Sequence, residues 1–167
     1  MASALADDAA RYAVFDLCGH TLALPAASVR RFLPVPALEH PPAMPPVVAG
    51  IFLWRGRVVP VLHLGRLLGL GEVPIALYTP LLLLERDDGP LALAADRVHG
   101  IVPVPAAQTS EVAEALSFEG CALATIPWAG GTATVLDPNR LLTTTEEMLL
   151  DAFRAQAEER LAQWQAP

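Results

Sequence analysis

The sequence predicts an all-β fold in which two related five-stranded small barrels are followed by one C-terminal helix. Three observations support this fold class. Short runs of β-branched, aromatic and aliphatic residues alternate with turns rich in Gly, Pro and Asp. Two stretches of sequence recur in the same order about 70 residues later. The last part of the chain instead places apolar residues at helical spacing.

The two internal repeats indicate a duplicated unit. From Gly19 the chain reads GHTLALPAASVRRFLPV, and from Gly89 it reads GPLALAADRVHGIVPV. The second repeat aligns VLHLGRLL from Val61 with VLDPNRLL from Val135. A period of this length is too long for a solenoid unit and fits two small barrels. We therefore expect two related β-subdomains.

Each half contains five runs that are typical of short strands. In the first half these are residues 12–17, 21–24, 30–35, 51–54 and 57–62. In the second half they are residues 80–86, 91–95, 100–104, 121–126 and 132–136. Turns are expected at Cys18-Gly19-His20, at Asp87-Asp88-Gly89 and at Gly130-Gly131. Five short strands in each half suit a small closed barrel.

The turn between the fourth and fifth strands contains Arg55 and Gly56. A two-residue turn would force Arg55 to a positive φ, which is unfavourable for a residue that carries a side chain. We therefore expect a slightly longer loop in which Gly56 takes the left-handed conformation.

The segment of residues 34–46 contains six prolines, at positions 34, 36, 41, 42, 45 and 46. This is too many for regular strand pairing, because proline lacks the amide hydrogen that the ladder needs. The segment is either an ordered crossing loop with an extended backbone or a mobile linker.

A helix is predicted over about residues 145–163. Thr144 followed by Glu147 indicates a capping box at its start. The apolar residues that recur at helical spacing are Leu149, Leu150, Phe153, Ala157, Leu161 and Trp164. The opposite side carries the charged residues Glu146, Asp151, Arg154, Glu158 and Glu159. We expect the apolar face to pack on the barrels of this chain and the charged face to meet water.

These elements divide the chain into three parts. They are a flexible N-terminal arm over residues 1–10, a single domain over 11–143 with β-subdomains at about 11–70 and 78–143, and an amphipathic helix over 144–167. The arm contains Asp7 and Asp8 and no basic segment that leads into an apolar stretch. It is therefore not expected to be a signal peptide.

Composition narrows the class of partner. Eighteen acidic and eleven basic residues give a formal charge of −7, which repels nucleic-acid phosphates and anionic lipid. Apolar content is 53%, but Pro, Gly and charged residues interrupt the apolar runs. None reaches the roughly 20 residues that a membrane helix needs. The two cysteines, Cys18 and Cys121, do not resemble a secreted disulfide framework. We expect a soluble cytoplasmic protein that binds another protein, with no nucleic-acid binding and no membrane insertion.

The sequence offers little chemistry. It lacks the Gly-x-Ser-x-Gly nucleophile elbow, the Walker phosphate loop and the His-Glu-x-x-His zinc pair. Its four histidines share no ligand spacing. Cys18 and His20 would form a thiolate and its base only if no turn separated them, and Gly19 is expected to place a turn there. We therefore expect neither an enzyme nor a cofactor or metal site.

His63 occupies the position that Asp137 occupies in the second repeat. Asp137 is followed by Pro138 and is expected to cap the start of a short helical turn. Because an imidazole caps less well, His63 either costs the first subdomain about 1 kcal/mol or has another use. A structural substitution is the favoured interpretation.

From Gly50 the chain reads GIFLWRGRVVPVL. This stretch resembles the CheW family of bacterial chemotaxis coupling proteins, whose signature reads GVINLRG followed by VVPVIDL. Further matches, over about residues 11–150, are Phe15-x-Leu17-x-Gly19, the Val29 segment, Leu67-Leu68-Gly69, Ala95-Asp96-x-Val98, Val135-Leu136-Asp137 and Leu141-Leu142. The resemblance implies two intertwined five-stranded SH3-like β-barrels that exchange strands.

The resemblance also implies a scaffold without catalytic activity. CheW-like proteins link the cytoplasmic tips of methyl-accepting chemoreceptors to the regulatory domain of the histidine kinase CheA, which is itself CheW-like. The implied partners are this receptor tip, this kinase domain and other CheW-like domains. The implied location is the receptor array on the inner face of the membrane, and a divergent member that serves a chemosensory cluster outside chemotaxis would fit.

The resemblance places partner contacts on one hairpin and one neighbouring strand. Val29 and Arg31 fall where the family contacts receptor, and Arg55 matches the motif arginine beside that surface. The expected contact residues are Val29, Arg31, Phe52, Trp54, Arg55 and Arg57. From the residues alone, two interpretations of Arg55 are about equally well supported. One is a partner contact, and the other is a structural role as a solvated turn charge or in a salt bridge to the neighbouring subdomain.

Several positions depart from the family pattern. They are Arg31, which replaces an acid, together with Leu53, Trp54, His63 and Gly65. We expect partner specificity at these positions, because a reversed charge can reject a wrong partner. The alternative hypothesis is a ligand-binding or enzymatic module with a deep polar pocket between the barrels, lined by Trp54, His63 and Cys121.

Overall fold

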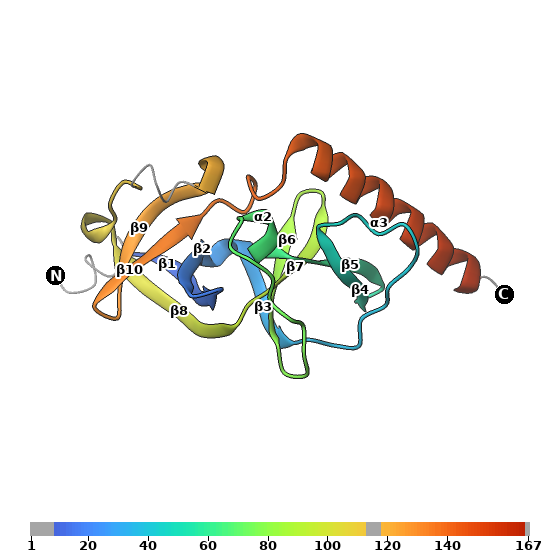
Figure 1. Cartoon of the computed structure of the whole chain (residues 1–167), viewed down its shortest axis with the longest axis horizontal. Helices are drawn as coiled ribbons and strands as arrows, with labels where there is room; N and C mark the ends of the chain where they lie inside the picture. Colours follow the sequence, from blue (N-terminus) through green and yellow to red (C-terminus); the bar gives the residue numbers. More distant parts are fainter. Residues whose placement is uncertain (1–8, 113–117, 166–167) are drawn as a thin grey trace.

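The chain forms two β-sheets that lie side by side, with one long helix running along the second sheet (Figure 1). A computed structural model describes residues 9–112 and 118–165. Most of the predicted arm, residues 1–8, and the last two residues of the predicted helix segment lie outside the described residues.

The described residues form ten strands at the ten predicted places, with ends that differ by a few residues at most. The first-half strands are β1 (Ala9–Leu17), β2 (His20–Pro25), β3 (Val29–Pro34), β4 (Val48–Trp54) and β5 (Arg57–Leu62). The second-half strands are β6 (Pro80–Arg86), β7 (Gly89–Ala94), β8 (Arg97–Pro105), β9 (Ala122–Trp128) and β10 (Gly131–Leu136). The helices are α2 (Leu64–Leu67) and α3 (Thr144–Gln165), with 3-10 turns η1 (Ala26–Ser28), η2 (Ala106–Gln108) and η4 (Phe118–Gly120).

The strand order confirms both the all-β class and the exchange between halves. One sheet has the order β8-β1-β2-β10-β9 and the other has the order β3-β6-β7-β5-β4. Each sheet therefore takes two strands from one half and three from the other. Exchanging every strand for its counterpart in the other half, β1 for β6, β2 for β7 and so on to β5 for β10, converts one order into the other. The duplication in the sequence is therefore also present in the strand topology.

The two halves are joined by parallel pairs inside otherwise antiparallel sheets. Strand β10 pairs with β2, with Thr134 opposite Leu22. Strand β5 pairs with β7, with Val61 opposite Ala92. Because these ladders cross between the halves, neither half completes its sheet alone.

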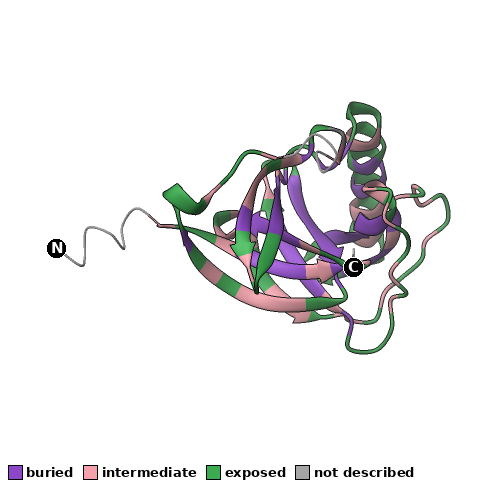
Figure 2. Ribbon diagram, turned by 60° about the vertical axis from the view of Figure 1, so that its left-hand side comes forward, coloured by how far each residue is buried: buried purple, intermediate pink, exposed green. Residues whose placement is uncertain are grey.

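The core has three parts, and the largest contains side chains from both sheets and from α3. Phe15 of β1, Leu82 of β6 and Phe153 of α3 belong to this shared cluster. The opposite faces of the same strands, represented by Val14 and Leu81, belong to a smaller cluster within each sheet. Figure 2 shows the buried residues concentrated along the strands and the inner side of the helix. Strands buried on both faces explain the nearly continuous apolar runs in the sequence.

The long helix begins with a capping box one residue earlier than predicted. The Glu146 amide donates a hydrogen bond to Thr143 Oγ1 at 3.2 Å, and the Thr143 amide donates to Glu146 Oε1 at 2.9 Å. Glu147, predicted to complete the box, instead pairs with Arg86 of β6. The prediction was wrong by one position because three consecutive threonines, residues 143–145, span the start of the helix and the pattern does not say which of them caps it.

The inner face of α3 differs from the predicted apolar stripe in one important residue. Leu150 and Phe153 pack in the shared core as expected, but Arg154 is also buried, with only 5% of its surface exposed. Its guanidinium donates to the backbone oxygens of Asp88 and Pro90, which bracket the start of β7. Burial lowers the pKa of Arg154, although Asp151 and Glu158 oppose that shift. Arg154 thus fastens the helix to the β6–β7 hairpin.

The proline-rich segment is an ordered crossing along the edge of β4, which resolves the two alternatives. The amide of Glu39 donates to the carbonyl of Ile51 at 2.8 Å, and the Ile51 amide donates back to Glu39 at 2.9 Å. The Val35 amide donates to the carbonyl of Thr79 at 2.9 Å. The two bonds between Glu39 and Ile51 cover part of the edge strand β4, which would otherwise be open, whereas the Val35 bond extends the pairing of β3 with β6.

Candidate partner-binding surface

The β4–β5 hairpin turns over two residues, which corrects the predicted longer loop. Trp54 pairs with Arg57, so only Arg55 and Gly56 lie between the strands. Their φ angles are 50° and 79°, both left-handed. Two-residue turns of this kind match the strand twist well enough for Arg55 to accept the conformation. The β9–β10 hairpin turns likewise at Ala129-Gly130, one residue before the predicted Gly130-Gly131.

Three predicted contact residues meet at the end of this hairpin. The guanidinium carbon of Arg31 lies 5.2 Å from the ring centroid of Trp54, and that of Arg55 lies 5.4 Å from the same centroid. Both distances are those of cation–π contacts. Both arginines are exposed, whereas the indole is half-buried and packs against the core of its own sheet. We call Arg31, Trp54 and Arg55 the arginine–tryptophan cluster.

Two further arginines flank this cluster and each has a carboxylate nearby. Arg30 Nη1 lies 3.0 Å from Glu85 Oε2, and Arg57 Nε lies 4.0 Å from Glu158 Oε1. Arg30, Trp54, Arg55 and Arg57 line a small cavity of about 100 Å³. Arg30 is not among the predicted contact residues, although its place beside Arg31 in a predicted strand indicates that it lies near this surface.

Two of the predicted contact residues are less available than expected. Phe52 is only 7% exposed and belongs to the core of the second sheet. Val29 is half-buried, packs against the shared core and pairs with Leu84. Strand alternation explains the difference, because Phe52 points inward while Leu53 beside it is 53% exposed.

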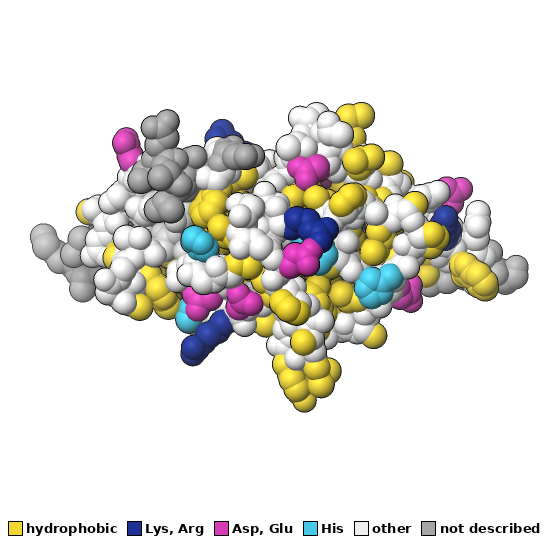
Figure 3. All heavy atoms as spheres, viewed as in Figure 1, with side chains coloured by type: hydrophobic (Ala, Val, Ile, Leu, Met, Phe, Trp, Pro, Cys, Tyr) yellow, Lys and Arg dark blue, Asp and Glu magenta, His cyan; other side chains and the backbone are white. Residues whose placement is uncertain are grey.

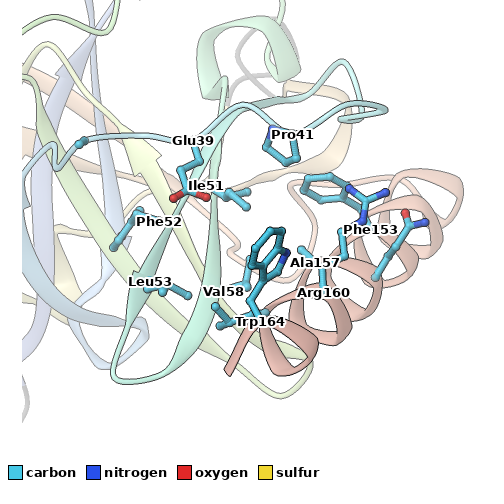
Figure 4. Close-up of a pocket in the computed structure, with 13 residues that line it drawn as sticks. Glu39, Pro41, Ile51, Phe52, Leu53, Val58, Phe153, Ala157, Arg160 and Trp164 are labelled. Carbon is cyan, nitrogen blue, oxygen red and sulfur yellow. The ribbon is translucent and has the colours of Figure 1, made fainter. Parts of the chain in front are cut away.

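A groove separates the last turns of α3 from the β4–β5 hairpin. It has a volume of about 360 Å³ and is lined mostly by apolar side chains, among them Ile51, Val58 and Leu161. Figure 4 shows Trp164 reaching from the last turn of the helix toward the hairpin, with Glu39 and Pro41 of the proline-rich segment at the top of the view. Trp164 is 88% exposed, so the predicted packing of the apolar face on the barrels fails at this end of the helix.

Another apolar surface lies on the loop between α2 and β6. Hydrophobic side chains gather where this loop projects at the bottom of the view in Figure 3. Leu77 and Tyr78 of the loop are 78% and 80% exposed.

The pocket of the alternative hypothesis does not form. Trp54 lines the small cavity beside Arg55. His63 lines a different, mainly apolar groove that it shares with residues of the loop before β6. Cys121 is buried, with its sulfur 2.7 Å from the carbonyl oxygen of Arg140. The three residues therefore lie in three separate places.

The positions around the α2 turn have structural explanations. His63 begins α2 without a capping hydrogen bond from its side chain, and burial together with the charge of Arg66 lowers its pKa. Asp137 Oδ1 accepts a hydrogen bond from the Asn139 amide at 2.9 Å, as expected of a capping residue, but the residues after it form a hydrogen-bonded turn and not a helix. A Cβ at Gly65 would lie 2.4 Å from the carbonyl oxygen of Gly71. Gly65 is thus required for packing and is not a specificity position.

The described residues hold one group of carboxylates close enough to share a cation. Asp88, Glu147 and Asp151 place one oxygen each within 4.8 Å of one another. Arg86 pairs with Glu147, and Arg154 Nη1 lies 3.8 Å from Asp151. Arginines thus already balance this charge, so the group has a structural explanation.

Cys18 and His20 are separated by their turn, as predicted. The Cys18 sulfur faces the backbone at Gly71, whereas the His20 ring packs edge-on against Phe118. Burial and the charge of Asp96 raise the pKa of the Cys18 thiol, which disfavours the nucleophilic thiolate.

Within residues 9–112 and 118–165, no helix is long and apolar enough to span a membrane.

Comparison with known proteins places the chain in a family. The model of the CheW-like domain matches residues 11–146. The crystal structure of the scaffolding protein TtCheW from Thermoanaerobacter tengcongensis is similar, with a TM-score of 0.72 and 16% sequence identity over 83% of this chain and 90% of that chain. At this identity the likeness shows the fold. No curated protein matches the chain. The match to the family model covers most of the sequence, and the chain therefore belongs to the family of CheW-like domains.

Proposed function

We propose that the protein is a non-catalytic adaptor that couples chemoreceptors to a CheA-type histidine kinase in bacterial chemosensory signalling. The observation that carries this proposal is the match of the CheW-like domain over residues 11–146. Its place of action would be the cytoplasmic face of the membrane, at receptor arrays. Other CheW-like domains are further candidate partners.

The arginine–tryptophan cluster supports a binding role, because it offers an aromatic ring and two exposed cations at one end of a rigid hairpin. Tryptophan and arginine are the residues most enriched among those that dominate binding energy. Contacts of micromolar strength, worth about −8 kcal/mol each, remain reversible and gain avidity when repeated in an array.

Pairwise binding tests the proposal. The full chain would be titrated with the receptor cytoplasmic tip and with the kinase regulatory domain from the same genome. Binding at tens of micromolar or tighter is expected, and Arg55→Ala should weaken one of the two contacts. Arg97→Ala is the matched control, because Arg97 is exposed at the start of β8 in the other sheet.

A second variant, Val29→Asp, probes strand β3. Because Val29 packs against the shared core, its thermal unfolding must be compared with the wild type before binding is interpreted. If neither partner bound the wild-type chain, and neither variant changed signalling in cells, coupling would be excluded as its role.

A further inference from the structure

We propose that the arginine–tryptophan cluster binds an acidic segment of a partner protein through carboxylates that bridge Arg31 and Arg55. This inference rests on the adaptor function proposed above and specifies the chemistry of its partner. It starts from the geometry of the cluster, in which one indole ring holds two guanidinium groups at 5.2 and 5.4 Å.

These two arginines differ from their neighbours in having no carboxylate. Arg30 pairs with Glu85, and Arg57 lies near Glu158. Among the described residues, no acid lies within ion-pair distance of Arg31 or Arg55. The chain contains 18 acidic and 11 basic residues. In a chain with this excess of acids, two neighbouring arginines without a carboxylate partner are unexpected. Charge complementarity therefore favours an acidic partner.

Contact with the ring also prepares the guanidinium groups for carboxylates. A guanidinium that stacks on an aromatic face keeps its N–H groups at the edge, where they can donate two parallel hydrogen bonds to one carboxylate. The contacts with Trp54 restrict the side chains of Arg31 and Arg55 before a partner binds, so that less conformational entropy is lost on binding. A basic segment would instead meet uncompensated positive charge and be rejected.

The net charge of the chain sets the expected salt dependence. At −7 the whole protein repels an acidic partner at long range. In about 0.15 M salt that repulsion is screened beyond roughly 8 Å, whereas hydrogen-bonded pairs at the cluster are screened much less. Binding should thus depend on contact at the two arginines and only weakly on long-range attraction.

The test uses the full chain and two synthetic peptides of the same length. One alternates Glu with Leu and Ala, and the other has Gln in place of every Glu. The indole N–H resonance of Trp54, assigned with Trp54→Phe, reports binding by NMR. The acidic peptide should shift this resonance. The Gln peptide should bind with an affinity lower by a factor of about ten or more. The double variant Arg31→Glu/Arg55→Glu should abolish the shift, and Arg97→Glu should leave it unchanged.

Three results would overturn the inference. These are equal binding of the Gln peptide, equal loss in Arg97→Glu, and stronger binding of the cluster to vesicles of phosphatidylserine and phosphatidylcholine than to the acidic peptide. The last result would indicate a lipid headgroup as the ligand.

The failure of this inference can be distinguished from failure of the adaptor role. If receptor tip or kinase domain binds wild type and the Arg31→Glu/Arg55→Glu variant equally, the adaptor role stands and the acidic contact is wrong. If neither protein binds but the acidic peptide does, the adaptor role is wrong and the chemistry of the surface is retained.

Discussion

Arg31 on β3 and Trp54 on β4 are in contact, with 5.2 Å between the guanidinium carbon and the ring centroid, although their strands form opposite edges of one sheet. The sheet therefore curls until its two edges approach each other at this ring. Trp54 therefore has two roles. It connects the two edges of the sheet, and its indole contacts the two exposed arginines of the cluster.

A double-mutant cycle with Arg31→Gln and Trp54→Leu measures this link. We expect the two changes to couple by about 0.5–1 kcal/mol in the free energy of unfolding, the range of an exposed cation–π contact. Urea unfolding of the wild type and the three variants gives the coupling. A cycle that pairs Arg97→Gln with Trp54→Leu is the control and should show none, and equal coupling in both cycles would contradict the contact.

Arg154 should be among the most important residues for the docking of α3. Arg154→Ala leaves two backbone carbonyls without their donor and removes charged hydrogen bonds, so we expect a loss of about 2–4 kcal/mol of stability. Arg160→Ala is the matched control on the same helix, because Arg160 is exposed, and should change stability by about 0.5 kcal/mol or less. Denaturant unfolding of both variants checks this, and equal small effects would argue against the anchoring role.

Gly65 should tolerate no larger residue. The Cβ of Gly65→Ala would approach the Gly71 carbonyl oxygen to 2.4 Å, which backbone movement must relieve. We expect a loss of about 1–3 kcal/mol, as for other overpacked sites. Gly131→Ala provides the comparison, because its nearest neighbour would be the Trp128 carbonyl oxygen at 3.7 Å. Thermal unfolding that ranks the two variants in the opposite order would refute the packing argument.

Stability should fall on acidification partly through His63. Burial and Arg66 lower the pKa of this imidazole in the folded chain. As the pH falls through about 6.5, the unfolded chain takes up the proton more readily, so stability decreases until the pH is below the folded pKa. Stability would be measured by urea between about pH 7.5 and pH 5. His63→Gln should flatten the curve, His40→Gln at an exposed site should not, and identical curves for both would contradict the assignment.

The sequence predicted local features and the repeat well, because strand alternation and turn residues act over short distances. All ten strands lie where the pattern placed them. The repeat indicated two related units, and the resemblance added the exchange of strands. The parallel pairs that carry out the exchange, such as β2 with β10, depend on contacts far apart in sequence, which local patterns do not encode.

The errors arise where tertiary contacts override a local rule. The charge pattern predicted that Arg154 faces water. It is buried instead, because its guanidinium donates hydrogen bonds to two backbone carbonyls of the β6–β7 hairpin. Arg55 accepts a left-handed backbone because the two-residue turn fits the strand twist. The cluster itself could not be predicted, because Arg31 and Trp54 meet only when the sheet curls.

The most direct test of the account is whether the protein bridges its two proposed partners. Receptor-containing membranes would be sedimented with the kinase from the same genome, with and without this protein, and the bound kinase measured. We expect kinase to sediment with receptor only when the wild-type chain is present, with recovery reduced by Arg31→Glu/Arg55→Glu and unaffected by Arg97→Glu. Equal amounts of sedimented kinase with and without the protein would contradict the adaptor role.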